Sequence, residues 1–237
     1  MLSVEGVSSG YGKLQILTDI SISAAESQVS VIVGPNGSGK STLLKTIAGL
    51  TSIYKGSVDF DGTKLSSLPS HLIARAGVAY LPQTEATFTQ LKVRENIIMA
   101  AYTVPSSEFA SRLESALKLF PQVSKYMETK VQNLSGGERQ MVAMVMALMR
   151  KPRVVMLDEP TANLSPKLAS EVLATVESLA SDLHLTVLLV EQNAKKALEM
   201  GQKAFLLVGG RKVFDGPAQD LLNHKELAQL YLGLKPQ

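Results

Sequence analysis

Residues 34–41 read Gly34-Pro35-Asn36-Gly37-Ser38-Gly39-Lys40-Ser41, a glycine-rich stretch that ends in a lysine and a hydroxyl side chain. The stretch fits the pattern G-x-x-x-x-G-K-[ST] and directly follows the apolar run 29–33, which predicts a buried strand. Residues 41–50 predict a helix. Glycines let backbone N–H groups curl around phosphate oxygens, and a helix start adds the positive end of its dipole. The pattern therefore favours a phosphate-binding loop over a plain strand-to-helix turn. Lys40 would reach the β- and γ-phosphates of a nucleotide, and the Ser41 hydroxyl would ligate Mg²⁺.

The flanking sequence alternates between short apolar runs and longer helical patterns. Further buried strands are predicted at 77–81, 154–157 and 187–190, and a helix at 193–200. Continuous apolar runs of this kind are typical of strands covered on both faces. The alternation predicts an α/β fold with a mainly parallel core sheet and helices on both sides.

The two ends of the chain have a different pattern from the core. Residues 2–7 and 56–60 predict short antiparallel strands, with Asp61-Gly62 as a turn. Residues 205–215 predict a hairpin around Gly209-Gly210. We therefore expect an antiparallel β subdomain on the N-terminal side of the core.

The middle of the chain is helical in pattern from about 88 to 149. We interpret this stretch as a helical subdomain inserted in the α/β core. Because no repeat, low-complexity tract or linker interrupts the sequence, we expect one domain over residues 1–237.

The composition of the 237-residue chain excludes several classes of function. Hydrophobic residues make up 45% and charged residues 19%, which rules out a disordered chain. The absence of cysteine excludes disulfides, zinc–thiolate sites and cysteine nucleophiles. A net charge of +3 gives no indication of nucleic-acid binding, so no nucleic-acid partner is expected. The longest apolar stretch, 141–149, is about half of what a membrane span needs, and a cytoplasmic protein is expected.

A second motif supplies carboxylates for the same site. Residues 154–160 read V-V-M-L-D-E-P, an apolar strand that ends in Asp158 and Glu159. Ligands of open α/β sheets bind at this carboxyl edge. Asp158 would hold Mg²⁺ through water, and Glu159 would polarise the attacking water. The alternative is an ordinary solvated acidic strand end. The presence of a phosphate-binding loop in the same chain disfavours that alternative.

The third motif, residues 134–140, reads L-S-G-G-E-R-Q. Ser135 and Glu138 form a capping box, which alone would explain a helix start. A capping box does not explain Gly136 and Gly137, since each glycine costs about 1 kcal/mol against alanine inside a helix. Close approach of an anion to the backbone would explain them. Since the first loop already serves this chain's own nucleotide, the pattern suggests a nucleotide held by another copy.

Together the three motifs resemble those of the ATP-binding subunits of ABC transporters, and the resemblance runs essentially end to end. Residues 134–140 are similar to the signature motif of that family, 34–42 to its Walker A motif, and 154–160 to its Walker B motif. The resemblance implies a P-loop NTPase fold of the ABC cassette type, with ATP and Mg²⁺ as cofactors. It also places Thr42 among the nucleotide-binding residues.

The resemblance implies roles for further residues. Tyr11 lies where the family stacks an aromatic ring on adenine. Residues 80–83 look like the Q-loop, so Gln83 would contact Mg²⁺ and the γ-phosphate side. The alternative for Tyr11 is an aromatic residue in a turn without a role in binding. The alternative for Gln83 is an ordinary amide side chain in a loop.

The resemblance also implies partners and a location. ATP would lie between the Walker A loop of one chain and Ser135, Gly136 and Gly137 of a second ATPase subunit, in a head-to-tail homo- or heterodimer. The helical subdomain at about 88–149 would contact integral membrane permease subunits. The protein would then be peripheral on the inner face of the cell membrane.

The sequence departs from the family pattern at two positions. Ser165 stands where the family usually has aspartate, and with Pro166 it also fits a plain helix N-cap. Gln192 stands where a histidine usually faces the γ-phosphate, which makes Gln192 a second candidate catalytic residue beside Glu159. The run V-E-Q-N-A at 190–194 resembles one of the two ATPase subunits of branched-chain amino acid importers.

The expected function is therefore Mg²⁺-dependent ATP hydrolysis that drives import of a solute, in particular branched-chain amino acids. Alternatives within the family are the ATPase of a urea or amide importer and that of a lipid or drug exporter. The alternatives from other classes are a soluble ABC ATPase without a transport role and a purely nucleotide-binding regulatory module. A single cassette without a heptad run disfavours the soluble class, and Glu159 with an intact signature disfavours the regulatory module.

Overall fold

The structure is a computed structural model that describes residues 1–84, 86–162, 164–224, 226, 227 and 231. The single domain expected over 1–237 therefore includes a C-terminal segment, 232–237, that lies outside the described residues, as does Asn163 beside the second motif.

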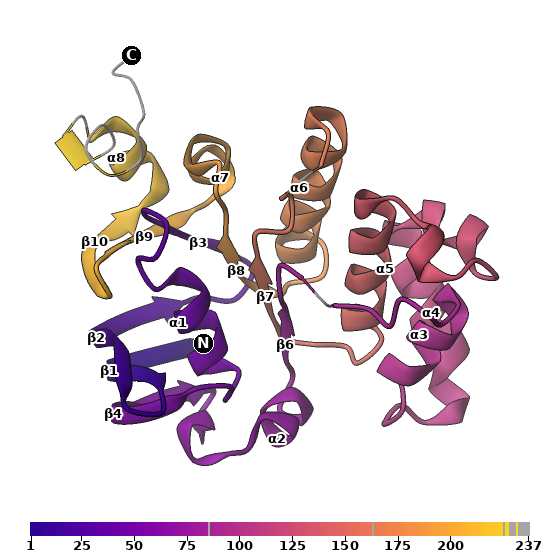
Figure 1. Ribbon diagram of the computed structural model, residues 1–237, viewed down its shortest axis with the longest axis horizontal. Helices are drawn as coiled ribbons and strands as arrows, with labels where there is room; N and C mark the ends of the chain where they lie inside the picture. The colour runs from indigo at the N-terminus through magenta and orange to yellow at the C-terminus, as the bar shows by residue number, and fades with distance from the viewer. Residues whose placement is uncertain (85, 163, 225, 228–230, 232–237) are drawn as a thin grey trace.

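A six-stranded sheet forms the centre of the fold (Figure 1). The strand order is β10-β9-β3-β8-β7-β6, and every neighbouring pair except β10–β9 is parallel. The strands are β3 (Val29–Val33), β6 (Val78–Leu81), β7 (Val154–Asp158), β8 (Thr186–Val190), β9 (Lys203–Val208) and β10 (Arg211–Pro217). The prediction of a mainly parallel core sheet is confirmed, as is the hairpin at Gly209-Gly210 between β9 and β10.

Side chains alternate between the two faces of this sheet, and each face has its own apolar core. On β7, Val154 and Met156 pack on one face, while Val155 and Leu157 pack on the other. The first face meets α1 (Lys40–Ile47) and a second sheet. Helices cover the other face: α5 (Gly136–Leu148), α6 (Pro166–Ser181), α7 (Ala194–Met200) and α8 (Ala218–Asn223).

The second sheet is antiparallel and has the order β2-β1-β4-β5. Its strands are β1 (Leu2–Tyr11), β2 (Leu14–Ala24), β4 (Ser52–Phe60) and β5 (Thr63–Lys64). The sequence predicted the first and third of these only as short strands at 2–7 and 56–60, and it missed β2. The reason is that the alternation of apolar and polar residues is interrupted within each strand. Buried Val4 and Val7 on β1, and buried Leu17 and Ile20 on β2, are three residues apart where the register shifts.

The helical stretch lies within the predicted 88–149. It contains α3 (Val93–Ala100), α4 (Ser106–Leu119), two 3₁₀ turns (Pro121–Tyr126 and Val131–Asn133) and then α5. In Figure 1, α3 and α4 lie beyond α5, at the far end of the molecule from β1, β2 and β4. Edge strand β6 lies between this region and the short helix α2 (Ser70–Arg75). Within the described part of the chain, no helix has the length and apolar character to cross a bilayer.

Candidate functional site: a phosphate-binding pocket at the sheet edge

The segments that follow four parallel strands meet at the carboxyl edge of the central sheet. They are the loop after β3, the loop after β6, Asp158 and Glu159 at the end of β7, and the turn after β8. They enclose an open pocket of about 520 Å³. The pocket is lined by Ile16, Asn36, Gly37, Ser38, Gly39, Lys40, Ser41, Thr42, Gln83, Glu159 and Gln192.

The loop after β3 has the backbone form that only glycine readily adopts at three positions, Gly34, Gly37 and Gly39. Gly34 has φ +148°, and a Cβ there would lie 2.1 Å from the Leu207 carbonyl oxygen. Gly39 has φ +99° and is the N-cap of α1, with no side-chain capping bond. The first N–H groups of α1 are therefore not capped by a side chain at Gly39, which suits an anionic ligand.

Lys40 is held inside this loop. Its ammonium donates hydrogen bonds to the carbonyl oxygens of Gly34 at 2.9 Å and Pro35 at 3.0 Å. Burial lowers the pKa of Lys40, while the nearby Glu159 and Asp158 act in the opposite direction. The lysine thus lines the pocket as a positioned donor whose charge has no carboxylate within salt-bridge distance among the described residues.

Asp158 receives a hydrogen bond on each carboxylate oxygen. The Ser41 hydroxyl donates to Oδ1 at 2.8 Å, and the Tyr80 hydroxyl donates to Oδ2 at 3.1 Å. Burial first, and then the charge of Asp158, raise the pKa of Tyr80 well above its usual value, so the phenol stays protonated at neutral pH. The sequence analysis placed Tyr80 at the start of the Q-loop but gave its side chain no role.

The oxygen donors at Ser41 and Asp158 fit a magnesium ion. Mg²⁺ prefers oxygen ligands and usually binds through one or two protein groups together with substrate phosphates and water. The described residues contain no group of three or more His, Cys, Asp or Glu side chains that could hold a metal by themselves. This is the donor set expected for an ion that enters with a nucleotide.

Glu159 projects from a strained turn. Its φ of +50° lies in the left-handed region, which is costly for a residue with a Cβ. Its amide donates to the Val190 carbonyl oxygen at 2.9 Å, which ties the turn to the end of β8. The Gln83 amide donates to Glu159 Oε2 at 2.7 Å. The two residues predicted for water activation and for the Q-loop are therefore in direct contact.

Glu191 is a second residue that the sequence analysis missed. Its side chain is buried and accepts hydrogen bonds from the amides of Thr161 at 3.1 Å and Gln192 at 3.2 Å. Burial raises the pKa of Glu191 despite these bonds. Glu191 thereby joins the turn after β7 to the turn after β8. A charged residue directly after an apolar strand was the only available signal.

The signature segment at the start of α5 has a different construction. Ser135 caps the helix by accepting from the Glu138 amide, and the Glu138 carboxylate accepts from the Ser135 amide at 2.7 Å, so the capping box is confirmed. A Cβ on Gly137 would lie 1.8 Å from Leu168 Cδ2, whereas a Cβ on Gly136 would meet open space. Packing against α6 thus accounts for Gly137, which the sequence analysis had explained by anion approach alone.

The remaining predicted residues divide into those near the pocket and those away from it. Of the described residues predicted to bind nucleotide, six do not line this pocket: Tyr11, Gly34, Pro35, Ser135, Gly136 and Gly137. The carbonyl oxygens of Gly34 and Pro35 instead accept hydrogen bonds from Lys40. Tyr11 ends β1 with an exposed side chain. Ser165 is the N-cap of α6 and accepts from the Leu168 amide at 3.4 Å, in agreement with the capping alternative.

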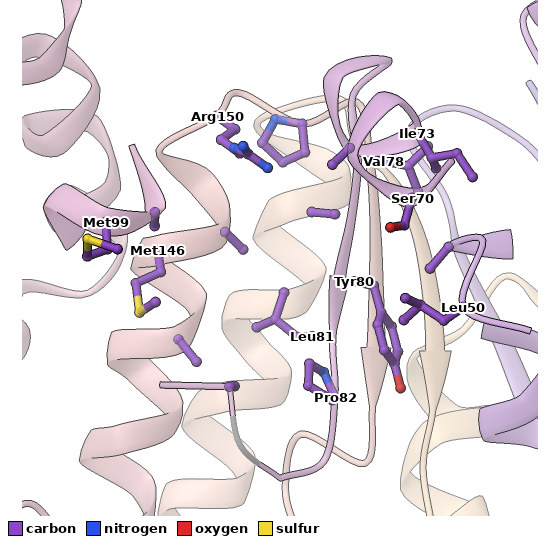
Figure 2. A pocket seen from close by; sticks show the side chains of 18 of the residues that line it. Leu50, Ser70, Ile73, Val78, Tyr80, Leu81, Pro82, Met99, Met146 and Arg150 are labelled. Atoms are coloured by element: carbon purple, nitrogen blue, oxygen red, sulfur yellow. The ribbon is translucent and has the colours of Figure 1, made fainter. Parts of the chain in front are cut away.

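An apolar groove of about 360 Å³ runs along edge strand β6 (Figure 2). Leu50, Ile73 and Tyr80 form one wall. Leu81, Pro82, Met99 and Met146 lie on the other side of the strand, and Arg150 lies at one end. Leu50 and Met99 are about half exposed although both are large and apolar. An exposed apolar surface of this kind is typical of a contact site for another protein.

Comparisons with known proteins agree with these observations. The family described as ABC transporter matches residues 17–162. The chain is 47% identical to a probable branched-chain amino acid transport ATP-binding protein, LivF, of Archaeoglobus fulgidus, over 99% of both chains. It is 36% identical to the high-affinity branched-chain amino acid transport ATP-binding protein BraG of Pseudomonas aeruginosa, over 98% of this chain and 100% of the relative.

The fold is shared with a solved structure. An ATP-binding cassette of an ABC transporter, in its ADP conformation, superposes with a TM-score of 0.86 over 97% of both chains at 24% identity. The arrangement of the two sheets and the helical region therefore matches that of a solved structure. By its family match, its close relatives and this architecture, the chain belongs to the ABC transporter family, as an ATP-hydrolysing subunit of a transporter.

Proposed function

We propose that the 520 Å³ pocket binds ATP with Mg²⁺ and hydrolyses it to drive import of branched-chain amino acids through separate membrane subunits. The observation that carries this proposal is the convergence of an uncapped helix start, Lys40, Ser41, Asp158 and Glu159 on one edge of the sheet. A cation, oxygen ligands for a metal and a carboxylate that can orient water are the parts that phosphoryl transfer to water needs.

In the proposed complex, Lys40 contacts the β- and γ-phosphates while the loop 34–42 surrounds them with backbone N–H groups. Ser41 and Asp158 hold Mg²⁺, with Gln83 beside them. The bound ion would neutralise charge that develops on the phosphate oxygens. Tyr11 would stack on the adenine from the exposed end of β1.

Hydrolysis is assigned to Glu159, which polarises the attacking water from the pocket side. Gln83, which donates to the Glu159 carboxylate, keeps that carboxylate on the side of the phosphates. Gln192 also lines the pocket, and its amide can donate to a γ-phosphate oxygen and accept from water. Unlike histidine, Gln192 adds no ionisation between pH 5 and 8.

We assign Ser135, Gly136 and Gly137 to the nucleotide of a second ATPase subunit in a head-to-tail dimer. Two features support this assignment. These residues do not line the pocket of their own chain, and Gly136 leaves open space where a phosphate could approach. The composition of the purified transporter distinguishes a homodimer from a heterodimer.

We assign the groove along β6 to a segment of an integral membrane permease subunit, which would place the protein on the inner face of the cell membrane. The groove is apolar, and Met99 and Met146 offer flexible side chains that adapt to a partner. Met99→Arg should abolish co-purification of the membrane subunits with the ATPase. The matched control is Val213→Arg, which puts the same charge on an exposed apolar residue of β10. Equal co-purification of both variants would contradict the assignment, and thermal melting shows whether each is folded.

The substrate class rests on the relatives, two of which are named for branched-chain amino acid transport. The test is uptake of labelled leucine, isoleucine and valine by proteoliposomes that contain the purified transporter. Uptake that requires ATP and is lost in Glu159→Gln supports the proposal. ATP-dependent uptake of urea without uptake of these amino acids would point to the amide importers instead.

A further inference from the structure

One side chain belongs both to the groove and to the metal-binding end of the pocket. Tyr80 lies on edge strand β6, and its ring forms part of the groove wall. Figure 2 shows the ring on the side of the strand that faces Leu50, opposite Leu81 and Pro82. Its hydroxyl reaches Asp158 of the neighbouring strand at 3.1 Å.

The parallel pairing of β6 and β7 explains how Tyr80 reaches so far. Tyr80 pairs with Met156, and alternation places Tyr80, Met156 and Asp158 on the same face of the sheet. Ser41 lies in the first turn of α1, which packs on that face as well. The long side chain of Tyr80 extends along β7 from its pairing partner Met156 to Asp158, two positions further on.

The two hydrogen bonds on Asp158 leave its carboxylate little freedom to rotate. Because the Tyr80 hydroxyl binds Oδ2, the other carboxylate oxygen, Oδ1, faces the Ser41 hydroxyl. Ser41 and Asp158 are the two residues assigned to Mg²⁺. Hydrogen bonds of this kind behind a metal-binding carboxylate orient it and commonly contribute 10–100-fold to metal affinity. The bond joins a neutral donor to a charged acceptor, which is a strong class of hydrogen bond.

We propose that Tyr80 is a positioning residue for the magnesium site, and that its hydroxyl holds the Asp158 carboxylate toward Ser41. The proposal rests on the assignment of Mg²⁺ to Ser41 and Asp158. Tyr80 itself does not line the 520 Å³ pocket.

The test is Tyr80→Phe, which removes the hydroxyl and keeps the ring that packs in the groove wall. Binding of Mn²⁺ as a probe is measured by electron paramagnetic resonance with a non-hydrolysable ATP analogue, and ATP-analogue binding is measured separately in EDTA. We expect Mn²⁺ affinity to fall by about tenfold or more, with nucleotide affinity in EDTA unchanged. The Mg²⁺ concentration for half-maximal phosphate release should rise by a similar factor.

The matched control is Tyr54→Phe. Tyr54 also donates its hydroxyl hydrogen bond, to the Gly12 carbonyl oxygen at 2.9 Å, but it lies on β4 of the antiparallel sheet. Mn²⁺ affinity in Tyr80→Phe equal to that of Tyr54→Phe would overturn the proposal. So would an equal loss of nucleotide affinity in EDTA, since that would indicate a general structural role. If the parent protein binds no Mn²⁺ with nucleotide, the metal assignment itself is wrong, which is a different result.

Discussion

Two helices of this protein have glycine at or next to the N-cap, but only one of them has a side-chain cap. At α1, Gly39 occupies the N-cap with a left-handed backbone and without a capping side chain. At α5, Ser135 and Glu138 form a reciprocal capping box around Gly136 and Gly137. The first helix start lacks a side-chain cap, and the second satisfies part of its hydrogen-bonding capacity within its own chain.

The difference teaches that a glycine in a motif has to be explained position by position. Gly34 is required because the Leu207 carbonyl oxygen lies where a side chain would be. Gly137 is required because Leu168 of α6 packs against it. Of the two signature glycines, Gly136 faces open space, so it is the position at which we propose that a second subunit's nucleotide approaches.

The largest effect is expected at the uncapped helix. Lys40→Ala should abolish hydrolysis and weaken ATP binding roughly 10- to 100-fold, because a hydrogen bond to a charged group contributes about 1.5–3 kcal/mol. Isothermal titration with ATP and a phosphate-release assay measure both. Lys45→Ala, in the last turn of the same helix, is the control and should resemble the parent. If Lys40→Ala has unaltered ATP affinity and turnover, the assignment of the nucleotide to this pocket is wrong.

Glu159→Gln should trap the proposed dimer, in which the start of α1 of one subunit faces the start of α5 of the other. It keeps the shape of the side chain and loses its basicity, so hydrolysis should fall by about 10²–10⁴-fold. ATP binding should persist, and a closed dimer should accumulate, which size-exclusion chromatography with MgATP detects. Glu177→Gln, on α6, controls for loss of a carboxylate elsewhere. A variant that stays monomeric under saturating ATP, with the other ATPase subunit present, would argue against the dimer.

A smaller effect separates the two signature glycines. Gly137→Ala should destabilise the fold by about 1–3 kcal/mol, because its methyl group would overlap Leu168. Gly136→Ala has room for the methyl group and should change the free energy of unfolding far less, while lowering ATPase activity if Gly136 contacts the second nucleotide. Urea denaturation gives the free energies. Combining Gly137→Ala with Leu168→Ala should recover part of the loss; without any recovery, overlap with Leu168 is not the cause.

The smallest effect compares two helix caps of the same type. Ser135 and Ser165 accept from the amides of Glu138 and Leu168 at 3.3 and 3.4 Å. Alanine at either position should cost about 1 kcal/mol of stability. Only Ser135→Ala should also lower the ATPase rate of the assembled transporter, because only Ser135 is assigned to the second nucleotide. Equal ATPase rates in the two variants would make Ser135 a cap alone.

The sequence by itself determined the parts of the protein whose signals are local. The loop 34–41, the apolar run that ends in Asp158 and Glu159, and the capping box at Ser135 were each readable from consecutive residues. Helical periodicity placed the region 88–149, and apolar runs identified all but one of the parallel strands, the remaining one being recognised as part of a hairpin. Such signals suffice because backbone conformation and strand burial depend on near neighbours.

Only the tertiary structure decided which residues meet across the fold. Tyr80 and Asp158 are 78 positions apart, and Glu191 binds the amide of a residue 30 positions away. Gly137 has its packing reason in a leucine of another helix. Strand β2 escaped the sequence analysis because an irregularity between its own buried residues Leu17 and Ile20 breaks the alternation. These features follow from strand register and helix packing, which arise from contacts between distant segments and leave no periodic trace in either segment alone.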